Sequence, residues 1–521
     1  MRNLTKIFVF SIVYIVLYNL PLVSFKHQGL LNLQALWEII LLIPALFILF
    51  ATTFLLLPRF LAISFTMLLF VIGGVATYYL VNFGKTLDNG VIIDILSVET
   101  ELAAEYISLN LVLYIVISLL IPIIIESIFT KYRILISSKI IVGIQLVCLG
   151  IFLLHDMGTK LDYKAISLLD HPPIKHFHVT GQFLTKYRLP NNKTKLKADL
   201  TKEHKVELKP LSNEPLMVVL VIGESMRGNI NALNGYKGHD NMPLLTGWSN
   251  LVSFPRARAS ATSTRVAIPY MLTNAIPPDF EAASNTKGVI SIFKHLGFKT
   301  SWLGNQGLFN YYDSNYASNA LEADYIISKE ELRIHLNQTL VHDESLLPYF
   351  KERLEMDSGN QFIVVHLIGS HWHFSHRYPE SFGHKFMPIC NSRAISDCSN
   401  EQMLNSYHNT IAYTDFVLDQ ILKALADKNA ILLYASDHGY SLNENGIFGN
   451  AYSGPNIPKE QLDIEMFGWM SDKFMQNNKS LYNQMLKNKN RDISHDYIFH
   501  SLLDCAGIRA DFIDLKLSVC R

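Results

Sequence analysis

Long apolar runs with few charges fill the first 155 residues of this 521-residue chain. Most of these runs are close to the roughly 20 residues that a helix needs to cross the hydrocarbon of a bilayer. They predict five spans, at Ile7–Leu22, Ile39–Leu57, Phe60–Val81, Leu111–Phe129 and Ile140–Leu154. The first run is not predicted to be a signal peptide, because no small-residue cleavage site follows it and further spans do. Residues 1–155 are therefore predicted to form an α-helical transmembrane domain.

Basic residues in the short loops predict the orientation of the spans. Arg2 and Lys6 precede the first span, Arg59 lies between the second and third, and Lys131 lies between the fourth and fifth. Positive loops favour the inside of the membrane, so the N-terminus is predicted inside. Five spans then place everything after His155 outside. The formal net charge is zero, so bulk charge indicates no nucleic-acid partner.

The rest of the chain predicts a connector followed by a folded domain. Residues 156–214 have few apolar runs and many Lys, Asn and His residues, with one interfacial helix predicted near Pro173–Tyr187. From Pro215 onward, strand and helix patterns alternate, which implies a mostly parallel sheet with helices on both faces. The predicted strands are 217–223, 299–303, 362–368 and 430–436, and the predicted helices are 287–297, 402–425 and 493–506. Residues 215–521 are therefore predicted to be one α/β domain.

Two of the predicted strands end in side chains that bind metal ions. Glu224 follows the first strand of the α/β domain, and Asp437 and His438 follow the strand at 430–436. The carboxyl ends of parallel strands are where α/β enzymes build their sites. Carboxylate oxygen together with imidazole suits Zn²⁺ or a similar divalent ion. These three residues therefore indicate a metalloenzyme.

A hydroxyl-rich loop stands before an apolar run in the segment Ala259-Ser-Ala-Thr-Ser-Thr-Arg-Val-Ala-Ile-Pro269. A hydroxyl at the start of a helix gains from the positive end of the helix dipole, and a coordinated metal lowers its pKa. The loop is therefore a candidate source of a nucleophile. The alternative is a structural role, in which Ser or Thr caps the first turn. Spacing alone leaves both interpretations open.

The chain resembles the phosphoethanolamine transferases of Gram-negative inner membranes, which belong to the alkaline phosphatase and sulfatase superfamily. The resemblance covers nearly the whole chain, including the spans that precede the enzyme domain. The segments that carry it are Val221-Ile-Gly-Glu-Ser-Met-Arg-Gly228, Leu233-Asn-Gly-Tyr236, Thr262-Ser-Thr-Arg-Val-Ala-Ile-Pro269, Leu367-Ile-Gly-Ser-His371, Ser436-Asp-His-Gly-Tyr-Ser-Leu-Asn-Glu-Asn-Gly446 and Ser494-His-Asp-Tyr-Ile-Phe-His500.

The resemblance implies a role for each matching residue. Glu224, Asp437 and His438 match zinc ligands of the family, and Thr264 matches the threonine that is both nucleophile and metal neighbour. His371 matches a histidine that contacts the substrate phosphate or a second metal. One Zn²⁺ is therefore expected, and a second stays open.

The implied reaction is a two-step transfer. Thr264 attacks phosphatidylethanolamine, diacylglycerol leaves, and an acceptor then takes phosphoethanolamine from the phospho-threonine. The implied acceptor is lipid A, the lipopolysaccharide core oligosaccharide or another envelope glycan. The implied location is the inner membrane of a Gram-negative bacterium, where membrane lipids are expected partners. Residues 215–521 would form a catalytic domain in the periplasm.

Several positions depart from the family pattern. Two cysteines that flank the nucleophile loop in related sequences are replaced here by Ser260 and Tyr270. Asn450 stands where a second histidine is expected after the Asp-His-Gly motif. Tyr440 stands where an acidic residue usually follows that motif. These changes leave the first zinc site intact and weaken the case for a second metal and for a lipid A acceptor. His373 and His376, near His371, are candidates to compensate.

Other residues extend the predicted site. Asn305, Gln306 and Asn450 are expected to contact the substrate. Cys390 and Cys398 match a loop that the family closes with a disulfide, while the pairing of Cys505 with Cys520 stays open. Disulfides are typical of an oxidising compartment, and unpaired thiols are the alternative.

Two other functions remain in view. A phosphoglycerol transferase or phosphohydrolase of the same superfamily would share the zinc and threonine core. An inactive envelope scaffold would keep the fold without needing the metal. A sulfatase is disfavoured, because the segment around Thr264 lacks the Cys/Ser-x-Pro-x-Arg signature.

Overall fold

The computed structural model describes residues 2–27, 29, 32–84, 108–131, 171–183, 197–308, 314–356, 359–392, 397–452 and 457–521. The chain divides into two compact units, Met1–Asn192 with Asn445–Phe448 and Lys193–Glu444 with Gly449–Arg521. The predicted boundary at residue 155 lies outside the described residues. The division into a membrane domain, a connector and a catalytic domain at 1–155, 156–214 and 215–521 therefore stays a prediction.

The N-terminal unit contains, in its described part, four helices long and apolar enough to cross a membrane. They are Leu4–Lys26, Leu33–Leu56, Arg59–Phe83 and Leu109–Thr130. These coincide with the first four predicted spans. The fifth predicted span, Ile140–Leu154, lies outside the described residues. The membrane region is thus helical, with four candidate spans described where five were predicted.

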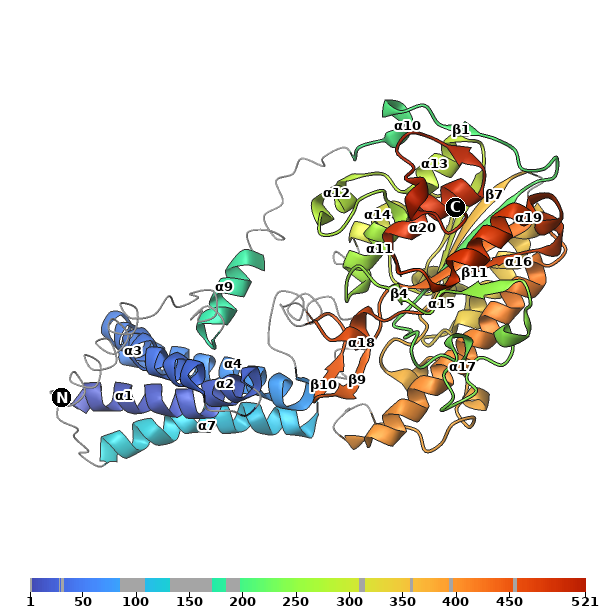
Figure 1. Ribbon diagram of the computed structural model, residues 1–521. Coiled ribbons are helices and arrows are strands. Elements are labelled where there is room, and N and C mark those ends of the chain that lie inside the picture. The colour runs from blue at the N-terminus through green and yellow to red at the C-terminus, as the bar shows by residue number, and fades with distance from the viewer. Residues whose placement is uncertain are drawn as a thin grey trace. The chain divides into compact units, whose positions relative to one another are not determined.

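The helices of this unit follow the chain in order (Figure 1). They are α1 (Arg2–Tyr14), the π-helical η1 (Ile15–Asn19), α2 (Leu20–Lys26), α3 (Leu33–Leu56), α4 (Arg59–Phe83), α7 (Leu109–Lys131) and α9 (Ile174–Phe183). The first three pieces together make the first span. Helix α9 falls within the segment Pro173–Tyr187, where one helix was predicted.

Charged side chains inside the helical unit are paired with one another. Lys6 of α1 and Glu126 of α7 are both buried, with Lys6 Nζ 2.8 Å from Glu126 Oε2. The Nε of Arg59, at the start of α4, donates to Glu126 Oε1 at 3.0 Å. Unpaired charges at membrane depth are costly, so these contacts make the ends of α1, α4 and α7 compatible with one bundle.

The second unit is built on a seven-stranded sheet with the order β3-β11-β8-β2-β7-β5-β6. The strands are β3 (Leu251–Ser253), β11 (Met466–Met470), β8 (Ala430–Ser436), β2 (Met217–Gly223), β7 (Gln361–His366), β5 (Lys299–Gly304) and β6 (Tyr325–Ile327). Strands β8, β2, β7, β5 and β6 are parallel, and β11 is antiparallel to both β8 and β3. The sheet is therefore mixed but mostly parallel.

Both faces of the central strands are buried, as continuous apolar runs in a parallel sheet predict. Every residue of β2 and β8 is buried. Alternate residues such as Val218, Leu220 and Leu433 belong to one core with α11 (Thr264–Leu272), α13 (Val289–His295), α19 (Asp472–Lys487) and α20 (Asp496–Cys505). The intervening residues face the other side, where α16 (Leu347–Met356) and α17 (Asn400–Leu425) lie (Figure 1).

The remaining elements are short. The helices are α10 (Leu200–Glu203), α12 (Phe280–Asn285), α14 (Ser314–Ala320), α15 (Lys329–Leu336) and α18 (Lys459–Leu462). The strands are β1 (Glu207–Leu208), β4 (Ala257–Arg258), β9 (Ser441–Glu444), β10 (Ile447–Gly449), β12 (Ile493–Ser494) and β13 (Ile508–Arg509). The structure contains the disulfide Cys390–Cys398, which the family resemblance implied, and also Cys505–Cys520, which the sequence left open.

Candidate metal centre

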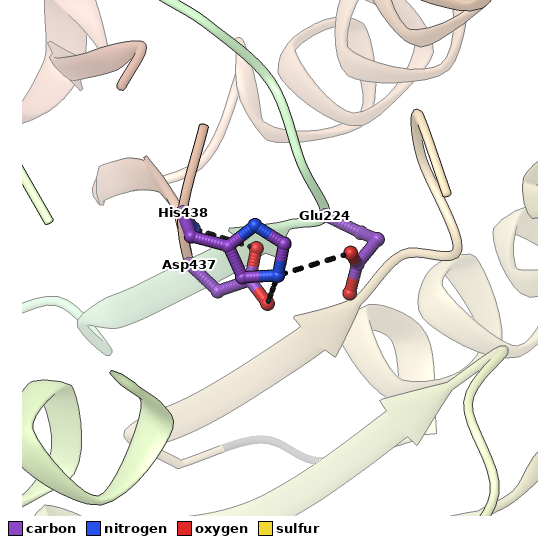
Figure 2. Close-up of side chains that lie close together, drawn as sticks. All are labelled: Glu224, Asp437 and His438. Carbon is purple, nitrogen blue, oxygen red and sulfur yellow. Dashed lines mark hydrogen bonds and ion pairs between the residues drawn. The ribbon is translucent and has the colours of Figure 1, made fainter. Parts of the chain in front are cut away.

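Strand register brings the predicted ligands together. Gly223, the last residue of β2, pairs with Ser436, the last residue of β8. The residues that follow each strand therefore emerge side by side, and the Asp437 N–H continues the ladder by donating to Gly223 O at 2.9 Å. Figure 2 shows the result, in which Glu224 from one strand faces Asp437 and His438 from the other.

The spacing of these three side chains fits a tetrahedral ion. Their ligand atoms all lie within 4.8 Å of one another, and all three residues are buried. His438 Nε2 is 3.4 Å from Glu224 Oε1 and 3.4 Å from Asp437 Oδ2. Zinc takes oxygen and nitrogen ligands at about 2.0–2.1 Å, so the ligands of a tetrahedral zinc ion are separated by about 3.3 Å. The two separations from His438 Nε2 match that edge length.

The two oxygens of Asp437 have different surroundings. Oδ1 accepts hydrogen bonds from the backbone N–H groups of Ser225 at 3.0 Å and His438 at 2.8 Å. Oδ2 is buried and has no hydrogen-bond partner among the described residues. A buried oxygen without such a partner is rare in proteins, and a bound ion is one of its ordinary explanations. The orphaned oxygen therefore supports a cation beside Asp437.

Hydrogen bonding fixes the tautomer of His438. Its Nδ1 lies 2.8 Å from Gly439 O. Because a carbonyl oxygen only accepts, Nδ1 carries the proton, and the lone pair is on Nε2. The same Nε2 lies 3.0 Å from the Nδ2 of Asn450, which donates to it. A metal ligand held by a backbone carbonyl on its far nitrogen is the usual arrangement of zinc-binding histidines.

Thr264 is the hydroxyl that the structure places beside this group. It is the first residue of α11, and its Oγ1 lies 3.0 Å from Glu224 Oε2 and 3.4 Å from His438 Nε2. Ser263 takes the N-cap position, but its side chain makes no capping hydrogen bond. Thr262 donates instead to Tyr452 O at 2.9 Å. Side-chain capping by Ser263 is therefore wrong, and Thr264 as the nucleophile stays a prediction.

Two of the three amides expected near the substrate lie in this cluster. Gln306 Nε2 donates to Glu224 Oε2 at 3.0 Å, and Asn450 contacts His438 as described. Asn305 is different, because its Nδ2 donates to Val341 O and to Asp343 Oδ1, both at 3.0 Å, and its side chain is fully buried. The structure gives Asn305 a supporting contact, and no described contact brings it to the cluster.

His371 follows β7 on the loop that passes Glu224. Its neighbour Ser370 donates its backbone N–H to Glu224 O at 2.9 Å. Burial lowers the pKa of His371, the Glu224 carboxylate opposes that shift, and Arg377 adds to it. The imidazole is therefore neutral near pH 7. His373 is turned toward Ser392 O and the hydroxyl of Ser375, both within hydrogen-bond distance.

Sequence reasoning gave no role to His495, although it lies in a quoted motif. Its Nδ1 accepts from the backbone N–H of Ser260 at 3.2 Å, and its Nε2 donates to Ser436 O at 2.9 Å. Strands β4 and β12 pair beside it. These contacts tie the loop before Thr264 to the end of β8. No local pattern in the sequence marked this role, because Ser436 and Ser260 lie far from His495 in the chain.

Two family models match the chain. The model described as Sulfatase matches residues 217–508, which is more than half of the chain. The model described as Phosphoethanolamine transferase EptA/EptB matches residues 29–168. The resemblance inferred from the motifs is confirmed by these matches.

Curated relatives carry related descriptions. Phosphoethanolamine transferase EptA of Escherichia coli (strain K12) is 29% identical over 320 residues, which cover 58% of this chain and 56% of the relative. The chain thus spans little more than half the length of that relative. Kdo(2)-lipid A phosphoethanolamine 7''-transferase of the same strain is 25% identical over 83% of this chain and 80% of the relative. EptA of Helicobacter pylori is 26% identical over 96% and 92%.

Solved structures share the architecture. The integral membrane protein lipooligosaccharide phosphoethanolamine transferase A (EptA) from Neisseria meningitidis covers 99% of this chain and 97% of its own, with a TM-score of 0.79 and 23% identity. The C-terminal periplasmic domain of EptC from Escherichia coli, in complex with Zn, covers 61% of this chain and 89% of its own, with a TM-score of 0.53 and 25% identity. The first match shows the fold, from the helical membrane region to the α/β domain.

Proposed function

Because the chain belongs to the sulfatase family and its N-terminal part matches the EptA/EptB transferases, we propose that it transfers phosphoethanolamine from phosphatidylethanolamine to an envelope acceptor. The observation that carries this proposal is the position of Thr264. Its hydroxyl stands at the start of a helix, within 3.4 Å of two members of the buried group Glu224, Asp437 and His438. A hydroxyl placed beside such a group is an activated nucleophile.

Glu224, Asp437, His438 and Thr264 are the residues that would hold zinc. Hard carboxylate oxygens, a neutral imidazole and a hydroxyl make a donor set that suits this ion. When bound, zinc lowers the pKa of the Thr264 hydroxyl and offsets negative charge on the phosphoryl oxygens. The orphaned Asp437 Oδ2 is the feature of this chain that supports one such ion.

In the first half-reaction, Thr264 Oγ1 forms a bond to the phosphorus of phosphatidylethanolamine. The bond between phosphorus and the glycerol oxygen breaks, and diacylglycerol leaves with the proton that the threonine gives up. The nine-residue helix α11 begins at Thr264, so the positive end of its dipole favours the phosphoryl group at this place. Gln306, which donates to Glu224, holds that carboxylate in position.

In the second half-reaction, an acceptor oxygen attacks the phosphorus of phospho-threonine. The bond to Thr264 Oγ1 breaks, and the threonine hydroxyl is restored. His371, neutral because burial lowers its pKa, is the candidate to contact the phosphate as a hydrogen-bond partner and not as a fixed cation. Asn450, beside His438, is the second candidate for contact with substrate.

The acceptor is proposed to be lipid A, core oligosaccharide or another envelope glycan. Names of the relatives support this class, since one is described as a Kdo(2)-lipid A transferase. The proposed location is the inner membrane of a Gram-negative bacterium, with the α/β unit in the periplasm. The apolar helices support membrane attachment, and donor lipid is a component of the bilayer itself.

The donor headgroup provides the test. The detergent-purified full chain is mixed with vesicles of phosphatidylethanolamine or of phosphatidylglycerol, and released diacylglycerol is measured beside Thr264→Ala. Release from phosphatidylethanolamine by the parent alone is expected. Release from phosphatidylglycerol alone would mean a phosphoglycerol transferase, and free phosphoethanolamine without transfer would mean a hydrolase. Bound zinc without any release would contradict an enzymatic function.

A further inference from the structure

Ser225, the residue after Glu224, has an unusual backbone conformation. Its φ is +59°, in the left-handed region that residues with a side chain seldom adopt. All of its polar groups are engaged. Its N–H donates to Asp437 Oδ1 at 3.0 Å, and its hydroxyl donates to Glu224 Oε1 at 2.5 Å. Such a conformation persists only where surrounding contacts hold it, and here it determines where the Glu224 carboxylate points.

The carbonyl of Ser225 is held by Tyr407, from the middle of α17. The phenol of Tyr407 donates to Ser225 O at 2.6 Å and accepts from the backbone N–H of Arg227 at 2.9 Å. One hydroxyl therefore spans the turn, bonding a carbonyl on one side and an N–H two residues later. The tyrosine side chain is fully buried, so no water competes for these bonds.

The phenol is suited to this double contact. Burial raises the pKa of Tyr407 far above its usual range, so the hydroxyl stays protonated and keeps its donor. A phenylalanine would fill the same space and also keep the edge contact with Phe374, whose ring centroid is 5.1 Å away. The hydroxyl is therefore the part of this side chain that packing alone does not require.

The next turn of α17 holds a second loop of the site. Thr410 donates to Tyr407 O at 2.6 Å, so its oxygen accepts from the hydroxyl of Ser370, also at 2.6 Å. Ser370 in turn donates its backbone N–H to Glu224 O. Tyr407 and Thr410 are three residues apart, which places both on one face of a helix. This face of α17 thus contacts the backbone after Glu224 directly, and it reaches the carbonyl of Glu224 through Ser370.

We propose that Tyr407 is a positioning residue of the metal centre, whose hydroxyl clamps the Ser225–Arg227 turn and so aims Glu224 at the ion. The inference rests on the metal centre of the proposed function, and it assigns Tyr407 no contact with substrate. The competing account is that Tyr407 only fills the core between α17 and the sheet.

Tyr407→Phe tests the clamp in the detergent-purified full chain. Zinc affinity is measured by competition with a chelator, and the geometry of the site is followed through the visible spectrum of the cobalt-substituted protein. We expect a loss of about 10- to 100-fold in zinc affinity, the range usual for residues that orient metal ligands, and an altered cobalt spectrum. Unchanged affinity and an unchanged spectrum would overturn the proposal.

Tyr413→Phe is the matched control. Tyr413 lies on the same helix, is also buried, and accepts a single hydrogen bond, from Glu344 N at 3.0 Å. Its removal is expected to leave zinc affinity and the cobalt spectrum as in the parent. Equal effects of the two variants on both readouts would assign Tyr407 to general packing and overturn the clamp.

Ser225→Gly supplies an independent readout. Glycine adopts a positive φ without strain. The backbone at position 225 then depends less on the Tyr407 hydroxyl to keep that conformation. Tyr407→Phe is therefore expected to cost less zinc affinity in the Ser225→Gly background than in the parent. Equal losses in both backgrounds, or failure of Tyr407→Phe to fold in either, would overturn the proposal. A parent that binds zinc normally but transfers nothing would refute the proposed reaction and leave the clamp standing.

Discussion

Asp437 shows how one buried carboxylate serves two purposes. Its Oδ1 caps two backbone N–H groups at the ends of β2 and β8, which is a structural task. Its Oδ2 has no hydrogen-bond partner in the described part of the chain, as is expected of an oxygen that binds a metal ion. A substitution that keeps the first oxygen and changes the second separates these tasks.

Asp437→Asn makes that separation. The amide oxygen can still accept both backbone bonds, while the NH₂ group has no lone pair for an ion. We expect zinc affinity to fall on the order of 100-fold or more, beyond the effect of residues that only orient ligands. We expect unfolding of the metal-free chain to be no easier than in the parent, because a buried charge is removed. Chelator competition and denaturant unfolding measure the two effects.

Asp419→Asn is the control for this experiment. Asp419 is also buried, lies on α17, and accepts from Trp248 Nε1 at 3.1 Å. It belongs to no metal group in the described part of the chain, so its substitution is expected to leave zinc affinity unchanged. Parent-like zinc affinity in Asp437→Asn would remove Asp437 from the ligand set.

At this scale the sequence predicted the three residues that the structure brings together, and it missed the residues that support them. Glu224, Asp437 and His438 were predictable because they stand within two residues of the ends of two strands, and strand ends meet at one edge of a parallel sheet. The choice of Thr264 over its neighbours came only from the family resemblance. Tyr407 and His495 were not predictable, because their partners Ser225 and Ser436 lie far away in the chain and no local pattern marks such contacts.

The register between β2 and β8 places the residues of the metal centre side by side. Long apolar strands at 217–223 and 430–436 were predicted with the observed bounds, since continuous runs of this kind are typical of central parallel strands. Strands β3, β6 and β11 were not predicted. They have three, three and five residues, and Gly468 interrupts the pattern of β11. Short strands take their pairing from neighbours and carry little signal of their own.

A buried histidine on helix α17 is expected to make the free energy of unfolding depend on pH. Burial lowers the pKa of His408 to about 3, with His239 and Arg227 adding to the shift, against 6.5 for an exposed histidine. The folded chain therefore keeps this imidazole neutral at pH 5, while the unfolded chain protonates it. The stability that the neutral His408 imidazole contributes is fully present above pH 6.5 and is lost progressively as the pH falls toward 3. One such group contributes a slope of about 1.4 kcal/mol per pH unit in that window.

His408→Asn is expected to remove that contribution. Denaturant unfolding between pH 6.5 and 4.5 should show a slope smaller by up to about 1.4 kcal/mol per pH unit, whatever the change in stability at pH 7. His335→Asn, at an exposed position on α15, should keep the slope of the parent. A slope that is the same in the parent and in His408→Asn would show that this imidazole does not carry the acid sensitivity.

On the scale of the whole molecule, composition predicted a membrane part and an α/β part, and the predicted boundaries at residues 155 and 214 stay predictions. Apolar runs identify membrane helices by length, and four of the five predicted spans are described. The predicted orientation depends on the number of spans, because one span more or fewer moves the α/β unit to the other side.

Thr264 is proposed to carry phosphoethanolamine between donor and acceptor. Mass spectrometry of the intact full chain, after incubation in detergent with phosphatidylethanolamine and no acceptor, tests this role. We expect a phosphoethanolamine adduct on the parent, located by digestion to Thr264, and no adduct on Thr264→Ala with zinc still bound. An adduct that persists on Thr264→Ala, or one located at Thr262 or Ser263, would contradict the assignment of the nucleophile.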